Sequence, residues 1–558
     1  MPFRRLTVYT KRLNSSLHGK RYDAIVVGGG HNGLVAAAYL AKAGKNVVVI
    51  ERRPVLGGAA VTEEIVPGFK FSRCSYVLSL LRPYIIKDLE LKKHGLKVYL
   101  RNPTSYTPVL STNKSLALWH ERYKTQQEIA KFSTQDAEAY PIYEDWIGRL
   151  TKAIYPLIDN EPPDIQQLLN RKWTNITGKM KQLVPPLTSV WTLGKEFPSF
   201  FELVSAPASK IVDRWFVSEP LRATLATDAI IGAVTSPRLP GSGYVLLHHV
   251  MGETEGRRHS WSYVEGGMGG VSSAIAASAK SHGAEIVTGM PVNEILVEDG
   301  SVVGVKLEDD SEVRSSIVLS NATPHITYME LLRKAKDSFT EDFIKQLNSY
   351  DYSSQVTKIN VALSGLPSFK ADPSGSSPLP HHQATIHINT CNTDLIHKAY
   401  EEAQMGHWSS RPMIEMCIPS VLDPTLAPKG NHVATIFTQY TPYTLNTGPW
   451  TEQDREAYAN TVFDWIEEYA PGFRKLIIDK EVLTPQDLER IFGLTGGNIF
   501  HGAMSLDQLY LARPTYTASC YRGQLKGMYL CGSGSHPGGG VMGACGHHAA
   551  QMVLNDMK

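Results

Sequence analysis

The sequence predicts an α/β fold in which a discontinuous Rossmann-type domain is combined with a second, α+β domain. Three glycine-rich segments predict it. The first, over residues 22–51, has the order strand, glycine turn, helix and strand, and two more follow at 265–307 and 527–543. Because the chain has 558 residues, it can form several domain-sized units with large cores.

Composition excludes several classes of protein. Hydrophobic residues make up 42% and charged residues 20%, which argues against disorder. The 56 Lys and Arg residues nearly balance 54 Asp and Glu residues, so no nucleic-acid partner is expected. No run of 18 apolar residues predicts a transmembrane segment. The six cysteines form no C-x-x-C pair and the histidines have no metal-site spacing, so we expect no metal and no disulfide framework.

The N-terminus carries a local excess of positive charge. Residues 1–21 contain six Lys and Arg side chains and no acid, and without them the remaining chain has a formal charge of 50 − 54 = −4. A basic, Ser-containing, acid-free start is typical of a mitochondrial transit peptide. We therefore predict a transit peptide at 1–21 and a location in the mitochondrial matrix. The alternative is a frayed basic N-terminus without a targeting role.

The first glycine-rich segment predicts a βαβ unit. Ala24–Val27 is a short apolar run suited to a buried parallel strand, and Asn46–Ile50 is a second one. Between them, the Ala-rich stretch Leu34–Ala43 predicts a helix.

The turn of this unit has the spacing of a dinucleotide-binding site. Gly28 permits the tight turn, Gly30 allows the backbone to approach a pyrophosphate, and Gly33 lets the helix pack closely on the strand. The phosphates then lie at the N-terminus of the helix. Glu51, at the end of the second strand, is placed to accept the hydroxyls of an adenosine ribose and would repel a 2′-phosphate. The predicted ligand is therefore FAD or NAD rather than NADP.

A Gly57-Gly58 pair follows the ribose carboxylate and predicts a second close approach of backbone to an extended ligand. With this pair, the sequence resembles the FAD-dependent amine oxidase and phytoene desaturase superfamily. The resemblance implies that the protein permanently holds one FAD molecule. The chain has one complete dinucleotide-binding motif, so we expect no separate NAD(P)H domain.

The resemblance continues through the middle and end of the chain. It implies that the backbone of Val292 contacts the adenine, and that the segment 527–543 directs a helix N-terminus at the ribityl chain and flavin ring. The cofactor-binding residues implied in this last segment are Gly532, Ser533, Gly540, Val541 and Met542. We assign residues 22–105, 255–330 and 485–558 to the FAD-binding domain, and residues 106–254 and 331–484 to the substrate domain.

The sequence departs from the superfamily at one phosphate contact. Many members have Arg after the Gly-Gly pair, where this chain has Ala59, so we expect Arg52 or Arg53 to replace it. We expect the segment that contains Cys74 to pass near the flavin, with Cys74 as a buried structural thiol.

Two residues are candidates for catalysis. Lys358 lies in a predicted strand, 355–363, and in amine oxidases a Lys at the similar position holds a water against flavin N5. A cation there would also stabilise reduced flavin. The alternative is a surface lysine. His536 lies in the flavin-facing segment, where an imidazole can relay a proton or line the substrate cavity; alternatively its hydrogen bonds fix the Pro537 turn.

Residues 179–191 and 197–201 mix basic, aromatic and Pro residues. We expect a core helix with a solvated basic face. The alternative is a surface for peripheral membrane contact, or an entrance for an apolar substrate.

Taken with the resemblance, these residues predict an FAD-dependent oxidoreductase that transfers a hydride from a small apolar organic substrate to flavin N5, with oxygen or a quinone as acceptor. An isomerase that uses reduced FAD is a chemical alternative. Two non-enzymatic alternatives remain: an FAD-stabilised scaffold that regulates a mitochondrial protein partner, and a flavin-free binder similar to GDP dissociation inhibitors.

Overall fold

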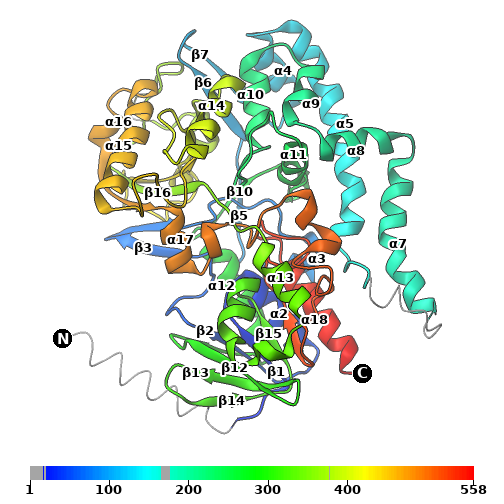
Figure 1. The fold of residues 1–558 in the computed structure, drawn as a ribbon. Helices are drawn as coiled ribbons and strands as arrows, with labels where there is room; N and C mark the ends of the chain where they lie inside the picture. The colour runs from blue at the N-terminus through cyan, green and yellow to red at the C-terminus, as the bar shows by residue number, and fades with distance from the viewer. Residues whose placement is uncertain (1–16, 18–19, 165–175, 376) are drawn as a thin grey trace.

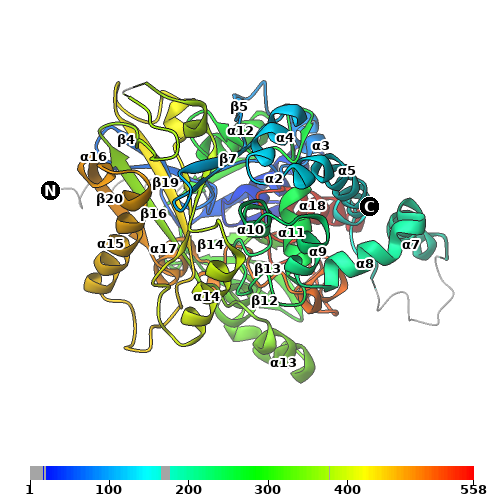
Figure 2. The same ribbon diagram turned by 90° about the horizontal axis from the view of Figure 1, so that it is seen from above.

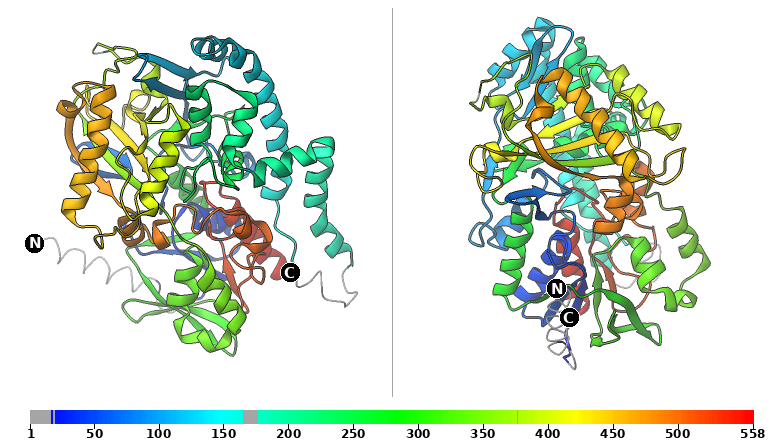
Figure 3. Two further views of the ribbon diagram at one scale, coloured as in Figure 1. Left: turned by 45° about the horizontal axis from the view of Figure 1, so that its top comes forward. Right: turned by 90° about the vertical axis from the view of Figure 1, so that its left-hand side faces the viewer.

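Two large sheets organise the molecule. The computed structural model describes residue 17 and residues 20–164, 176–375 and 377–558, so most of the predicted transit peptide 1–21 lies outside the described residues. Segments from the beginning, middle and end of the chain gather in one part of the molecule, and the yellow and orange segments gather with the cyan helices in the other (Figure 3). The predicted α/β fold is confirmed.

The first sheet has five parallel strands in the order β11-β2-β1-β15-β21, of which β1, β2 and β15 are labelled in Figure 1. Its strands come from all three glycine-rich segments of the sequence: β1 (Ala24–Val27), β2 (Val47–Glu51), β11 (Glu285–Thr288), β15 (Val318–Ser320) and β21 (Met528–Leu530). The central strands are buried on both faces, which explains why they read as continuous apolar runs.

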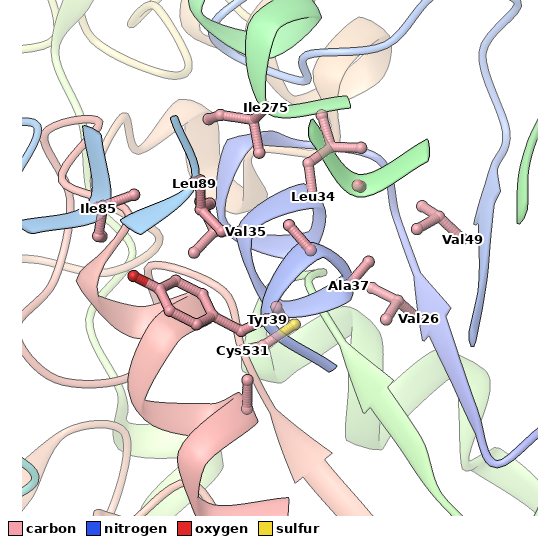
Figure 4. Packing of buried hydrophobic residues seen from close by; sticks show 14 of the residues in the cluster. Val26, Leu34, Val35, Ala37, Tyr39, Val49, Ile85, Leu89, Ile275 and Cys531 are labelled. Atoms are coloured by element: carbon pink, nitrogen blue, oxygen red, sulfur yellow. The ribbon is translucent and has the colours of Figure 1, made fainter. Parts of the chain in front are cut away.

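Helix α2 (His31–Lys42) covers one face of this sheet and lies against α12 (Gly269–Ser281) and α18 (Ala544–Asp556). Figure 4 shows this packing, in which Leu34 of α2 lies toward Ile275 of α12 and Val35 lies beside Leu89. On the other face, an antiparallel sheet of β12 (Val292–Glu298), β13 (Ser301–Leu307) and β14 (Glu312–Arg314) completes the core. Helix α2 begins three residues earlier than the sequence predicts, directly after Gly30.

The second sheet has seven strands in the order β20-β16-β19-β18-β17-β6-β7, mostly antiparallel. They are β6 (Ser105–Val109), β7 (Lys114–Leu118), β16 (Val356–Leu363), β17 (Thr385–Ile388), β18 (Met413–Cys417), β19 (His432–Gln439) and β20 (Ile477–Leu483). Alternate side chains such as Ile359 and Ile436 pack beneath α15 (Glu452–Tyr469). The residues between them face the interior of the molecule.

Helices from the first part of the substrate segment form a cap beside this sheet. They are α4 (Arg122–Ala130), α5 (Thr134–Ile158), α7 (Ile176–Leu193), α8 (Phe197–Ser205), α9 (Ala208–Trp215), α10 (Glu219–Thr227) and α11 (Ser242–Val250). The smaller elements are α3 (Pro83–Asp88), α13 (Glu341–Ser349), α14 (Thr393–Gln404), α16 (Phe473–Leu476), α17 (Pro485–Phe492), β3 (Thr62–Val66), β4 (Phe69–Ser72), β5 (Val98–Leu100), β8 (Glu253–Thr254), β9 (Arg257–Arg258) and β10 (Ser262–Val264).

Helix α7 lies at the edge of the molecule, beside α5 (Figures 1 and 2). Trp191 is 85% exposed, and Leu187 and Phe201 are each 64% exposed. The prediction of a core helix in this segment is therefore wrong: its apolar side chains lie on the surface. None of the helices in the described part of the chain has the length and hydropathy needed to cross a bilayer.

Candidate active site

A connected cavity of about 590 Å³ lies at the carboxyl edge of the five-stranded sheet and extends to the seven-stranded sheet. Its volume is in the range of small-molecule sites. Residues at or beyond the ends of the parallel strands line it: Gly28 after β1, Glu51 in β2, Asn321 after β15 and Ser533 after β21. This edge is where open α/β sheets bind ligands.

The structure brings most of the predicted site residues to this cavity. Those that line it are Gly28, Gly30, Glu51, Arg52, Gly58, Val292, Ser533, Gly540, Val541 and Lys358. The others pack behind the wall: Gly33, Gly57, Gly532, Met542 and His536.

The N-terminus of α2 provides a place for phosphate. Its N-cap is Gly30, no side chain caps it, and its first turn has no acidic residue, so backbone N–H groups remain for a ligand in the cavity. A Cβ on Gly30 would lie 2.6 Å from Asn321 Nδ2, and one on Gly33 would lie 2.2 Å from the carbonyl oxygen of Gly28. These glycines therefore maintain the tight turn and the close contact of helix and strand.

The Gly57-Gly58 pair docks on this turn. Gly57 N–H donates to the carbonyl of Gly29 at 2.9 Å, and a Cβ on Gly58 would lie 3.2 Å from Gly30 Cα. Gly57 thus approaches the turn itself, while Gly58 also lines the cavity.

Glu51 is held in the orientation that a ribose ligand requires. The side chain is buried at the end of β2, where Oε2 accepts the Gly29 N–H at 2.7 Å and Oε1 accepts the Arg53 N–H at 2.8 Å. Each carboxylate oxygen can accept further hydrogen bonds. The residues present therefore fit an adenosine ribose with free hydroxyls.

The two arginines after Glu51 have different surroundings. Arg53 pairs with Glu63 at 2.7 Å and lies 4.9 Å from the centroid of the Phe492 ring. Arg52 donates to the carbonyl of Ile491 at 3.2 Å and has no carboxylate partner in the described part of the chain. Both arginines line the cavity, and Nη1 of Arg53 is buried without a hydrogen-bond partner in the described residues, so both stay candidates for contact with an anionic ligand group.

Cys74 lines the cavity, but burial raises the pKa of its thiol to about 12. The thiol therefore stays protonated at neutral pH, which supports a structural role. All six cysteines are free, and within the described ranges no three His, Cys, Asp or Glu side chains form a metal-binding group.

Lys358 is buried, with 2% exposure, because β16 is covered on both faces. This excludes the surface alternative. Its Nζ donates to Asn360 Oδ1 at 2.6 Å and to the carbonyl of Ser72 at 3.4 Å, and it lies 5.4 Å from the centroid of the Tyr76 ring. Burial lowers the pKa of Lys358 to about 7. An amine with this pKa can hold and release a proton at neutral pH.

Strand register places Lys358 in a row of buried side chains that line the cavity. Lys358 on β16 pairs with Phe437 on β19, Phe437 with Glu415 on β18, and Glu415 with His387 on β17. Three strand spacings separate Lys358 from His387, roughly 14 Å. The sequence did not predict Phe437, Glu415 or His387, because their alignment depends on the pairing of four strands that are distant in the chain.

Burial shifts the pKa values of the ionisable groups in this row toward their uncharged forms. The Tyr76 hydroxyl donates to Glu415 Oε2 at 2.7 Å, and burial raises the pKa of Glu415. Burial lowers the pKa of His387 to about 3, so this imidazole is uncharged. Nearby, burial raises the pKa of Asp228 to about 8, and the neighbouring carboxyl group of Glu415 adds to this increase.

His536 lies behind the wall rather than in it. Its Nε2 donates to the carbonyl of Leu157 at 2.6 Å, and its own carbonyl accepts the Tyr521 hydroxyl at 2.7 Å. Burial lowers the pKa of His536 to about 4. This geometry supports the structural alternative and gives His536 no contact with the cavity. Val541, five residues later in the chain, lines the cavity with a φ of 53°, an unfavourable backbone conformation for a β-branched residue.

Sequence reasoning also missed several histidines and an asparagine at the cavity. His31, His248 and His501 are among the histidines that line it; His248 is buried, and neither of its ring nitrogens has a hydrogen-bond partner in the described residues. Asn321 could have been found as the residue that follows a buried parallel strand.

Comparisons with known proteins agree with this architecture. The model of the NAD(P)-binding Rossmann-like domain matches residues 26–86. The chain is 55% identical to "Pyridine nucleotide-disulfide oxidoreductase domain-containing protein 2" of Rattus norvegicus, over 98% of this chain and 96% of the relative.

More distant similarities cover nearly the same length. The chain is 26% identical to a limonene dehydrogenase polypeptide of Castellaniella defragrans, over 96% and 95% of the two chains. It is 25% identical to the chloroplastic prolycopene isomerase of Daucus carota, over 95% and 80%. The solved structure of cyclohexylamine oxidase from Brevibacterium oxydans is 13% identical, covers 96% of this chain and 100% of its own, and has a TM-score of 0.54. This last similarity shows a shared fold.

Proposed function

Because the chain belongs to the family of pyridine nucleotide-disulfide oxidoreductase domain-containing protein 2, whose relatives are oxidoreductases, we propose that it binds FAD and removes a hydride from a C–H bond of a mainly apolar organic substrate. The word disulfide in the family name finds no counterpart here, since all six cysteines are free and none forms a C-x-x-C pair.

One observation carries the proposal: a single cavity connects the dinucleotide turn and Glu51 with the buried amine of Lys358. A dinucleotide held at the carboxyl edge of the five-stranded sheet would therefore share an enclosed space with a substrate on the seven-stranded sheet. Holding both reactants in a fixed geometry is a large part of what such an enzyme contributes.

Different side chains would bind the cofactor, hold a proton and contact the substrate. A bound flavin would supply the hydride acceptor. Glu51 and the N-terminus of α2 hold the ribose and phosphates, and Lys358 Nζ holds or takes up a proton beside the substrate. Tyr140, Tyr143, Ile147 and Leu225 line the far part of the cavity, where they exclude water and contact an apolar molecule.

The names of two relatives support an apolar substrate. One is a dehydrogenase of limonene and the other an isomerase of prolycopene. Both names refer to hydrocarbons, which fit the aromatic and aliphatic lining of this part of the cavity. They leave dehydrogenation and isomerisation as the two chemistries to separate by experiment.

Purification tests the proposal directly. We expect a yellow protein that releases one FAD per chain on denaturation, and whose photoreduced flavin is reoxidised by oxygen or by a quinone. A colourless protein that binds no added FAD would refute the proposal and favour a flavin-free binder. A flavin that no acceptor reoxidises would favour an FAD-stabilised scaffold.

We further propose that the enzyme works in mitochondria, at a membrane surface. The acid-free basic composition of residues 1–21 supports targeting. The exposed side chains of Leu187, Trp191 and Phe201, together with the exposed Lys181 and Lys195, support peripheral contact with an anionic bilayer.

Two experiments test this location and this contact. Residues 1–21 fused to a fluorescent protein should direct it to mitochondria, and diffuse fluorescence would refute targeting. The protein should sediment with vesicles of phosphatidylcholine and cardiolipin. A double Trp191→Ser, Phe201→Ser variant should lose this binding, whereas the control Tyr123→Ser, at a side chain 60% exposed on α4, should keep it.

A further inference from the structure

Arg101 follows β5 and is a buried cation in the wall of the cavity. Its side chain is 1% exposed. Its Nε donates to the carbonyl of Trp261 at 2.8 Å, its Nη1 donates to Thr385 Oγ1 at 2.7 Å, and the guanidinium lies 5.1 Å from the centroid of the Tyr263 ring. All of these partners are neutral.

Other buried arginines in the described residues are compensated. Arg82 donates two hydrogen bonds to Asp159, at 2.7 and 2.8 Å, and the partly buried Arg73 pairs with Glu63 and Glu481. Arg513, which is 0% exposed, donates to five backbone carbonyls, those of Phe500, Gly502, Ala503, Gln508 and Ser533. Within the described ranges, Arg101 has neither a carboxylate within 4.0 Å nor such a set of carbonyls. A buried charge without a counter-ion is costly.

Glu415 on β18 does not serve as the counter-ion of Arg101. Glu415 directs Oε2 to the Tyr76 hydroxyl at 2.7 Å, and its Oε1 lies 3.5 Å from Nδ1 of the neutral His387. Burial raises the pKa of Glu415, which favours its uncharged form. The positive charge of Arg101 therefore faces a cavity whose nearby described side chains do not pair with it.

We propose that Arg101 binds a carboxylate of the substrate, so that the substrate is an amphipathic acid rather than a pure hydrocarbon. A guanidinium matches a carboxylate with two parallel N–H···O bonds. This inference rests on the proposed function, because it assigns the substrate class of the same cavity.

The geometry also orients this acid. Arg101 contacts Thr385 on β17 at 2.7 Å and Cys417 on β18 at 3.7 Å. These residues lie two positions along their strands from His387 and Glu415 of the row that begins with Lys358. The carboxylate would thus bind two to three strand spacings and two residues away from Lys358, roughly 12 to 16 Å. The reacting carbon lies far from the acid group, with the apolar body of the substrate between them.

Binding of a matched ligand series tests the proposal. The purified protein is titrated by calorimetry with decanoate, decanol and decylamine, which differ in the head group. We expect decanoate to bind about 10- to 100-fold more tightly than decanol. Arg101→Met should remove this preference and leave decanol affinity unchanged, Arg101→Lys should restore part of it, and the exposed control Arg149→Gln should behave as wild type.

Equal affinity of the wild type for decanoate and decanol would overturn the proposal, as would an equal loss of both in Arg101→Met. Tighter binding of decylamine would assign the cavity to cations held by Glu415 and Asp228. If Arg101→Met does not fold, the wild-type series and Thr385→Val, which removes one neutral support of Arg101, still decide the question. Calorimetry requires no flavin turnover. A colourless protein that prefers decanoate would therefore refute the proposed function alone.

Discussion

The two parts of the cavity wall are built differently. On the five-stranded sheet, the wall consists of glycine turns, an uncapped helix end and one fixed carboxylate, Glu51. On the seven-stranded sheet, it consists of large buried side chains with shifted pKa values, among them Lys358, Glu415 and His387. The first part is suited to hold a constant ligand by its backbone. The second part is suited to choose a substrate and to move protons.

This difference predicts two separable classes of defect. We call the part on the five-stranded sheet the glycine wall and the part on the seven-stranded sheet the side-chain wall. Substitutions at the glycine wall should remove the cofactor, because any side chain there would block the close approach of the backbone to the ligand. Substitutions in the side-chain wall should leave the cofactor bound and change the reaction. A glycine substitution that keeps the cofactor, or a substitution in the side-chain wall that loses it, would contradict this comparison.

The largest effect is expected for Gly30→Val. A Cβ at this position would lie 2.6 Å from Asn321 Nδ2, and a branched side chain would occupy the phosphate site. We expect a folded, colourless protein without measurable FAD. The control Gly375→Val, where a Cβ meets no atom within 4 Å, should stay yellow. Stoichiometric FAD in Gly30→Val would remove this turn from the site.

Lys358→Met should act on the reaction alone. Loss of the buried amine removes a proton carrier, so we expect reoxidation of the photoreduced flavin to slow by about 10²- to 10⁴-fold. FAD content should stay at one per chain. Lys306→Met, at a surface lysine paired with Asp310, serves as control. An unchanged rate would show that Lys358 is structural.

Lys358 should also change how stability depends on pH. Its pKa is about 7 in the folded protein and about 10.4 in the unfolded chain, so the unfolded state binds more protons between these values. The free energy of unfolding should therefore rise with pH by about 1.4 kcal/mol per unit from this group between pH 7 and 10. Urea unfolding of wild type and Lys358→Met isolates the contribution as a difference in slope. Parallel slopes would contradict a lowered pKa.

The smallest effect is expected for Glu51→Ala. Removing the carboxylate loses a charged hydrogen bond to ribose and should weaken FAD binding by about 1.5 to 3 kcal/mol. Fluorescence titration of the flavin-depleted protein measures it. Glu51→Gln keeps the shape and part of the hydrogen bonding, so its affinity for FAD should lie between those of the wild type and Glu51→Ala. Wild-type affinity in both variants would place the adenosine elsewhere.

The same contrast explains what could be predicted from the sequence. The glycine wall follows from local rules, since Gly28, Gly30 and Glu51 lie within 24 residues and their spacing has one physical interpretation. Lys358 came from a resemblance, and its burial became evident only with the sheet. His536 was given a catalytic alternative from its place in a motif, but the carbonyl of Leu157, far away in sequence, determines its orientation.

The polar row and Arg101 could not be predicted in the same way. Phe437, Glu415 and His387 face one another because four strands pair in a particular register, and no short motif encodes that register. The apolar face of α7 was assigned to the core because amphipathic patterns do not distinguish a buried helix from one whose apolar side remains exposed.

The assembly of the central sheet has a consequence for biosynthesis. Strand β1 pairs with β15, nearly three hundred residues later, and β21 joins only at residues 528–530. A ribosome must therefore translate almost the whole chain before this sheet can close, and the nascent protein must keep its early strands soluble until then. Premature termination anywhere upstream of β21 should yield no partially functional enzyme.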